Sequence, residues 1–73
     1  MYILFDDANA DALVASTYKD SLLKFFIKYR VKTYNMESIR DEFDFDPLHP
    51  VTMNDYEELL EYFSFSIKEV KLI

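Results

Sequence analysis

Carboxylates are the side chains in this sequence that are most able to do chemistry or to bind cations. From Glu37 to Glu61 there are nine acids and one base, Arg40, and no Lys or Arg occurs between Asp41 and Ile67. Carboxylates at alternate positions of an extended segment lie about 6.6 Å apart, and those one helical turn apart lie about 5 to 6 Å apart. A nucleic-acid strand carries one charge per roughly 3.4 Å of axis, which is a step of the same order. The stretch therefore predicts a DNA-like surface that binds a basic partner through Asp41, Glu42, Asp44, Asp46, Asp55, Glu57, Glu58 and Glu61.

The alternative is that these acids are only solvated, in a non-enzymatic oligomeric, adaptor or antitoxin-like module. Acids do keep a small protein soluble, and the formal net charge here is −6. However, Glu57 with Glu61, and Glu58 with Glu61, are like charges one helical turn apart, at a cost of up to about 0.5 kcal/mol per pair. Selection for solubility alone would intersperse both signs. The pattern thus favours a surface that needs its carboxylates together.

Catalytic and metal chemistry fit the sequence poorly. Asp44 and Asp46 could belong to a calcium loop, but such a loop needs further oxygen ligands and a Gly, whereas Pro47 follows and the chain has no Gly. Without Gly there is no phosphate-cradling loop either. The single His, His49, has no nucleophile motif beside it, and there is no Cys for a thiolate site. We therefore expect no catalytic residue, no metal, no cofactor and no enzymatic activity.

A basic segment precedes the acidic one. Between residues 19 and 32 there are one acid and five bases: Lys19, Lys24, Lys28, Arg30 and Lys32. Aromatic residues are interleaved with these bases. This would be the best case for direct nucleic-acid binding. Ordinary amphipathicity explains it as well, because the rings fall on the apolar face and the lysines on the wet face. We expect no direct nucleic-acid binding, and a helix that balances the acidic half within the monomer or across a dimer.

The first half of the chain predicts a hairpin followed by a helix. Apolar runs at residues 2–5 and 12–15 flank a polar, turn-rich stretch, which is typical of a β-hairpin. Ser16 or Thr17 can cap the next helix, with Asp20 completing a capping box. Apolar residues at helical spacing predict that this helix runs from Tyr18 to Arg30.

The second half predicts one firm helix and a final strand. A short helix over residues 36–42 and an irregular segment fit that region equally well. Residues 43–46 alternate rings with carboxylates, as an extended segment would, and Pro47 and Pro50 bound a loop. Asn54 with Glu57 suggests a capped helix from residue 55 to 63 or 64. Residues 65–67 and 70–72 alternate in a strand whose phase changes at Lys68-Glu69, which suggests a bulge.

These elements define one α+β domain over residues 1–73. A small antiparallel sheet, made of the N-terminal hairpin and the C-terminal strand, should pack against two or three helices in the order β-β-α-(α)-α-β. The chain is 51% hydrophobic and 18% aromatic, more than a core of this size easily buries, so a homodimer is expected. The start has no basic region and meets acids by residue 6, so we expect neither a signal peptide nor a membrane span. With no Cys, the expected location is a reducing cytoplasm.

The acidic half resembles a known class of proteins. The segments DEFDFD at residues 41–46 and DYEE at residues 55–58 pack acids around aromatic rings in a small chain without cysteine. In this character the chain is similar to the small acidic inhibitors that bacteriophages make against host DNA-handling proteins. Members of that group block sliding clamps, glycosylases or defence nucleases, often as dimers. The resemblance implies a phage-encoded DNA mimic that occupies a basic channel of a host replication, repair or defence protein, with a sliding clamp as the first expectation.

Overall fold

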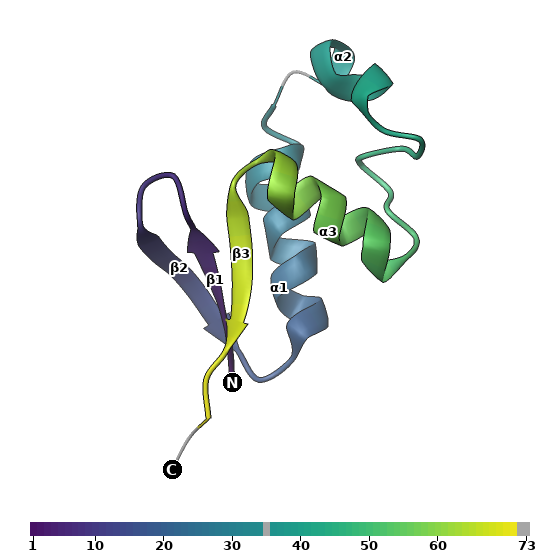
Figure 1. The fold of residues 1–73 in the computed structure, drawn as a ribbon. Coiled ribbons are helices and arrows are strands. Elements are labelled where there is room, and N and C mark those ends of the chain that lie inside the picture. Colours follow the sequence, from purple (N-terminus) through teal and green to yellow (C-terminus); the bar gives the residue numbers. More distant parts are fainter. Residues whose placement is uncertain (35, 72–73) are drawn as a thin grey trace.

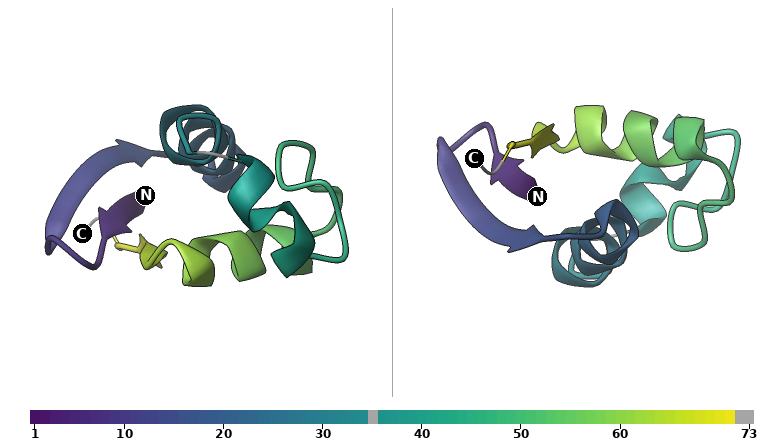
Figure 2. Two further views of the ribbon diagram at one scale, coloured as in Figure 1. Left: turned by 90° about the horizontal axis from the view of Figure 1, so that it is seen from above. Right: turned by 90° about the horizontal axis from the view of Figure 1, so that it is seen from below.

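The computed structural model describes residues 1–34 and 36–71. Its three strands form one antiparallel sheet in the order β2-β1-β3, and Figures 1 and 2 show the helices on the same side of that sheet. The α+β class and the β-β-α-α-β order are thus confirmed. The elements are β1 (Tyr2–Asp6), β2 (Asp11–Ser16), α1 (Lys19–Phe26), a π-helical turn (Ile27–Val31), α2 (Met36–Ile39), a 3₁₀ turn (Arg40–Glu42), α3 (Met53–Tyr62) and β3 (Phe65–Glu69).

The predicted hairpin forms, and its turn is fixed by local hydrogen bonds. The carboxylate of Asp6 accepts bonds from the backbone N–H of Ala8 and from the side-chain amide of Asn9, at 3.2 and 2.7 Å. Ala10 closes the turn with a φ of 56°, a left-handed conformation that costs a non-glycine residue some strain. The hairpin therefore turns without Gly because a side chain supplies acceptors that the turn backbone needs.

The sheet contains one irregularity, and it is not where the sequence suggested. The predicted bulge at Lys68-Glu69 is wrong, because β3 pairs with β1 in unbroken register from Phe65 to Glu69. The register shifts instead between β1 and β2, where Leu4 faces Val14 but Phe5 faces Ala12. The phase change that suggested a bulge arises because the chain leaves the regular strand after Glu69, and Val70 is 41% exposed rather than turned to the core.

Helix α1 begins later than predicted and without the predicted capping box. Its N-cap is Tyr18, with no side-chain cap bond, and Tyr18 is 72% exposed instead of lying on the apolar face. Ser16 does not cap the helix, because it is the last residue of β2. Its hydroxyl instead accepts a hydrogen bond from the N–H of Tyr18 at 3.1 Å. The helix then continues to Val31, but its last turn is π-helical.

Helix α3 forms close to its predicted range, with a different cap. Thr52, not Asn54, is the N-cap, and its hydroxyl accepts the N–H of Asp55 at 3.2 Å. Asp55 returns the bond by accepting the N–H of Thr52 at 3.2 Å, so the capping box is complete. A capping box does begin the helix, but the predicted pair of Asn54 and Glu57 is wrong, because the box starts two residues earlier.

The core lies between the helices and the sheet. Phe26 of α1 is fully buried, with its ring centroid 5.2 Å from that of Phe65 in β3 and 6.1 Å from that of Phe63. Leu4 and Leu59 are also fully buried, and each buried side chain of this size stabilises the fold by about 1.5 to 3 kcal/mol. This packing fixes α3 on the sheet with one face of the helix left in solvent.

The connection between α1 and α3 contains the short helix that was one of two predicted alternatives. It spans α2 and the 3₁₀ turn, and Ile39 anchors it in the core at 2% exposure. The rings of Phe43 and Phe45 are half-buried with centroids 5.3 Å apart, whereas Asp44 and Asp46 are exposed. The alternation of rings and carboxylates is confirmed, although the segment bends and pairs with no strand among the described residues.

Candidate acidic binding face

The outer face of α3 carries three exposed carboxylates, from Glu57, Glu58 and Glu61. They lie there because Leu59 and Leu60 pack into the core, which leaves positions 57, 58 and 61 on the opposite side of the helix. The last turn of α3 contains no basic residue, so the partial negative charge of the helix C-terminus adds to theirs. These three residues are called the α3 acidic face below. Figure 1 shows α3 beside α1 and leading directly into β3.

Two residues of the α3 acidic face also border a groove between α3 and β3. Its volume is about 500 Å³, and Glu57 and Glu61 stand on one wall. Asp7 stands on the other side, where its carboxylate accepts a hydrogen bond from the hydroxyl of Ser66 at 2.9 Å. Buried and half-buried apolar side chains, Leu60, Phe65 and Ile67, form the floor. Lys19 lines the groove as well, so three carboxylates and one base surround its apolar floor.

Three more of the predicted acids lie exposed on the connection before α3. Asp41 and Glu42 belong to the 3₁₀ turn, and Asp44 borders a shallow hollow with Arg40. Glu42 lies close to Tyr62 at the end of α3: partial burial raises the pKa of the Tyr62 phenol above 10.0, and Tyr34 and the Glu42 charge raise it further. The connection thus brings one carboxylate toward the C-terminal end of α3.

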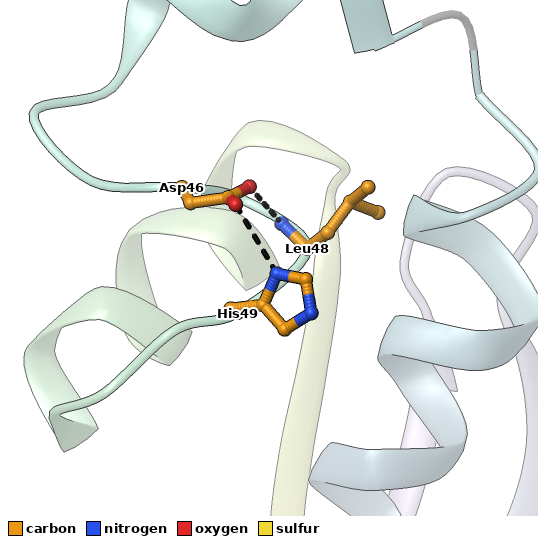
Figure 3. A network of polar contacts seen from close by, with 3 residues as sticks. All are labelled: Asp46, Leu48 and His49. Atoms are coloured by element: carbon orange, nitrogen blue, oxygen red, sulfur yellow. Dashed lines mark hydrogen bonds and ion pairs between the residues drawn. The ribbon is translucent and has the colours of Figure 1, made fainter.

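Asp46 is engaged by its own loop. Its carboxylate accepts the N–H of Leu48 at 3.0 Å and lies 3.1 Å from Nδ1 of His49 (Figure 3). These bonds, first that from Leu48 and then that from His49, lower the pKa of Asp46 below 3.8. The loop between the two prolines is therefore held by this carboxylate, and the exposed His49 has a structural partner.

Asp55 is likewise engaged, by the backbone that enters α3. Its carboxylate accepts the N–H of Val51 at 3.1 Å and that of Thr52 at 3.2 Å. The bond from Val51, followed by that from Thr52, lowers the pKa of Asp55 below 3.8. Of the eight predicted partner-binding acids, Asp46 and Asp55 thus serve the fold through backbone hydrogen bonds, although Asp46 is also exposed. The other six are exposed: Asp41, Glu42, Asp44, Glu57, Glu58 and Glu61.

The fold also assembles a basic groove that the sequence reasoning missed. Lys24, Lys28 and Lys32 follow at one-turn spacing and line a hollow of about 440 Å³ with His49 from the proline-bounded loop. The spacing of the three lysines could have indicated a row on one helix face, but no local signal placed His49 opposite them. The three lysines of this groove therefore lie on another surface than the α3 acidic face, whereas Lys19 of α1 lines the groove that Glu57 and Glu61 border.

Direct ion pairing does not join these two surfaces. Among the described residues other than Glu37, no Lys or Arg lies within salt-bridge distance of a carboxylate. The ion pair found among these residues joins His49 to Asp46. Arg30 packs instead over the rings of Phe63 and Tyr34, at 5.1 and 5.4 Å from their centroids. If the basic helix balances the acidic half within the monomer, it does so over distances longer than a salt bridge.

The remaining surface gives no sign of a metal centre or a membrane segment. Within residues 1–34 and 36–71, no three acidic, His or Cys side chains are grouped closely enough to hold a metal ion. In the same residues, no helix combines the length and the apolar character that crossing a bilayer requires. The α3 acidic face and the two grooves are thus the features from which a function can be argued.

Comparisons with protein-family models, with curated proteins and with solved structures found no match to this chain. No residue role is therefore taken from a relative. The functional argument depends on the exposure, charge and contacts of the side chains described above.

Proposed function

We propose that this protein inhibits a DNA-handling protein by binding its basic DNA-binding surface in place of DNA. The observation that carries the proposal is the α3 acidic face: three exposed carboxylates at one-turn spacing, with no base on the helix and no Lys or Arg of the described residues within salt-bridge distance. Like charges in this arrangement weaken a helix. A requirement for negative charge at this place explains why the sequence retains them.

Binding would proceed through long-range attraction followed by short-range pairing. The six exposed carboxylates lie on α3 and on the connection before it, and their field would steer a basic groove toward them and raise the association rate. On contact, Lys and Arg side chains that hold phosphates would hold carboxylates, Arg in bidentate geometry. The core fixes the backbone of α3, so the carboxylates on it lose little conformational freedom when they bind.

The rest of the proposed role concerns the target. The partner is a host replication, repair or defence protein with a basic channel or groove, and a sliding clamp is the first candidate. The protein acts there without catalysis, as a phage-encoded inhibitor in the bacterial cytoplasm. The exposed negative charge on α3 and on the connection before it supports this class of target.

A pull-down from a bacterial lysate, with and without competing duplex DNA, would identify the partner. Three baits of equal shape make it specific: the parent, the variant Glu57→Gln, Glu58→Gln, Glu61→Gln, and the variant Asp11→Asn, Asp20→Asn, Glu69→Gln. The last two lose the same number of charges, the second from exposed acids outside the α3 acidic face. Capture by the parent and the control, loss with the α3 variant and release by DNA are expected. Equal capture by all three would reject the proposal.

A further inference from the structure

The sheet has two edges, and only one is suited to pairing. The edge at β2 is interrupted by the bulge opposite Leu4 and Phe5, and bulges are a common protection of edge strands. The edge at β3 pairs with β1 in regular register over all five of its residues. A regular edge strand offers unpaired backbone groups to another strand, so β3 is the edge at which the sheet can be extended.

The backbone groups of β3 that face this edge can be assigned. Met1 and Val70 exchange both backbone bonds, at 3.1 and 2.7 Å, and the N–H of Asp7 donates to Ser64 at 2.8 Å. Bonded pairs alternate along an antiparallel ladder. The N–H and C=O groups that turn outward, away from β1, are therefore those of Phe65, Ile67 and Glu69.

On the sheet face away from the helices, the charge beside this edge is complementary to the charge that β3 carries. The edge borders a groove lined by three acids and one base, Asp7, Glu57, Glu61 and Lys19, and β3 itself carries Lys68 and Glu69. Lys68 lies 5.1 Å from the centroid of the Phe5 ring, on the sheet face away from the helices. Ser66, whose hydroxyl holds the Asp7 carboxylate, lies on this same face. On this face Lys68 of one strand can therefore fit Asp7 beside an identical strand, whereas Glu69 lies on the opposite face.

We propose that two copies of this chain pair antiparallel along β3 and form one six-stranded sheet. The two-fold axis passes beside Ile67, so the outward groups of Phe65 in one copy bond those of Glu69 in the other, and Ile67 bonds its counterpart. In this register Lys68 of the second copy lies opposite Ser66 and within reach of Asp7. The two-fold axis repeats the contact. On the helix face Ile67 lies opposite its counterpart, and Glu69 of the second copy lies opposite Phe65 at the groove that Lys19 also lines. The proposal does not rest on the inhibitor function, because its partner is a second copy of the chain, although Glu57 and Glu61 of the α3 acidic face border the same groove.

Analytical ultracentrifugation of the full chain at micromolar concentration tests the edge. The parent should sediment at twice the 8.8 kDa of one chain. Glu69→Pro removes an outward N–H without removing a bond to β1, and should weaken the dimer at least about tenfold. Glu69→Ala keeps that N–H and should leave the dimer intact. Ala15→Pro makes the same change at the β2 edge and should also leave the dimer intact.

A charge exchange tests the register and does not depend on how a proline variant folds. Asp7→Lys and Lys68→Glu should each weaken the dimer, and the double variant should restore it, because each lysine then faces a carboxylate again. A monomeric parent, a dimer that tolerates Glu69→Pro in a folded protein, or a double variant no stronger than either single one would overturn the proposal. So would species larger than a dimer, which would indicate head-to-tail contact between the acidic and basic surfaces.

Discussion

Replacing the α3 acidic face with glutamines should stabilise the protein. In the variant Glu57→Gln, Glu58→Gln, Glu61→Gln, two like-charged pairs one turn apart disappear, each at about 0.2 to 0.5 kcal/mol. Negative charge also leaves the C-terminal half of a helix that has no base in its last turn, which contributes roughly 0.3 kcal/mol or more. Gln matches Glu in helix propensity, and at position 58 its amide oxygen can still accept the 3.5 Å bond from Asn54. The expected gain is about 1 kcal/mol, or roughly 4 to 8 °C in Tm for a domain of this size.

Thermal melting followed by circular dichroism at low salt and pH 7 would measure this gain. All variants must be compared at one protein concentration, because dimerisation makes Tm concentration-dependent. The gain should shrink at 1 M salt, where the Debye length is about 3 Å. The control variant Asp11→Asn, Asp20→Asn, Glu69→Gln loses as much charge but relieves neither pair on α3, and should gain less. An unchanged or lower Tm of the α3 variant would refute the view that these carboxylates are kept at the expense of local stability.

Three further effects concern the fold that supports the acidic face. Thr52→Ala removes the capping box of α3 and should destabilise the protein by about 1 kcal/mol in urea unfolding, whereas Asn54→Ala should have a smaller effect. The folded-state pKa values of Asp46 and Asp55 lie below 3.8, so their ionised carboxylates stabilise the fold fully above that pH. This stabilisation is lost as the pH falls through the lowered pKa values. A titration of Tm with acid should show the loss, and Asp55→Asn should make the loss smaller. Phe26→Ala leaves a cavity among Phe63 and Phe65 and should destabilise the fold by about 3 to 5 kcal/mol, enough to leave the chain largely unfolded by circular dichroism.

Most of the fold follows from local patterns. The hairpin, α1 and α3 were predicted because apolar residues at strand or helix spacing reflect which face each element buries. The cap of α3 shows the limit of such reasoning: Thr52 with Asp55 and Asn54 with Glu57 both match a capping box. Asp55 also accepts a hydrogen bond from the N–H of Val51. This bond depends on how the backbone turns after Pro50, which residue spacing alone does not specify. The bulge was misplaced for a related reason, since register depends on the neighbouring strand.

The candidate site was predictable in its charge but not in its individual roles. The sequence identified all eight acids, yet it did not separate Asp46 and Asp55, whose oxygens bond the backbone, from the other six. That separation depends on loop geometry. The basic groove needed tertiary information as well, because His49 comes from a loop far along the chain from Lys24 and Lys28.

Displacement of duplex DNA tests the central proposal most directly. Fluorescence anisotropy of a labelled duplex bound to a bacterial sliding clamp, or to the partner that the pull-down identifies, would be followed during titration with the protein. The proposal predicts that the parent and the Asp11, Asp20, Glu69 control release the DNA, that the folded Glu57, Glu58, Glu61 variant does so far more weakly, and that added salt weakens the competition. Equal displacement by the folded α3 variant, or a ternary complex in which DNA stays bound, would contradict it.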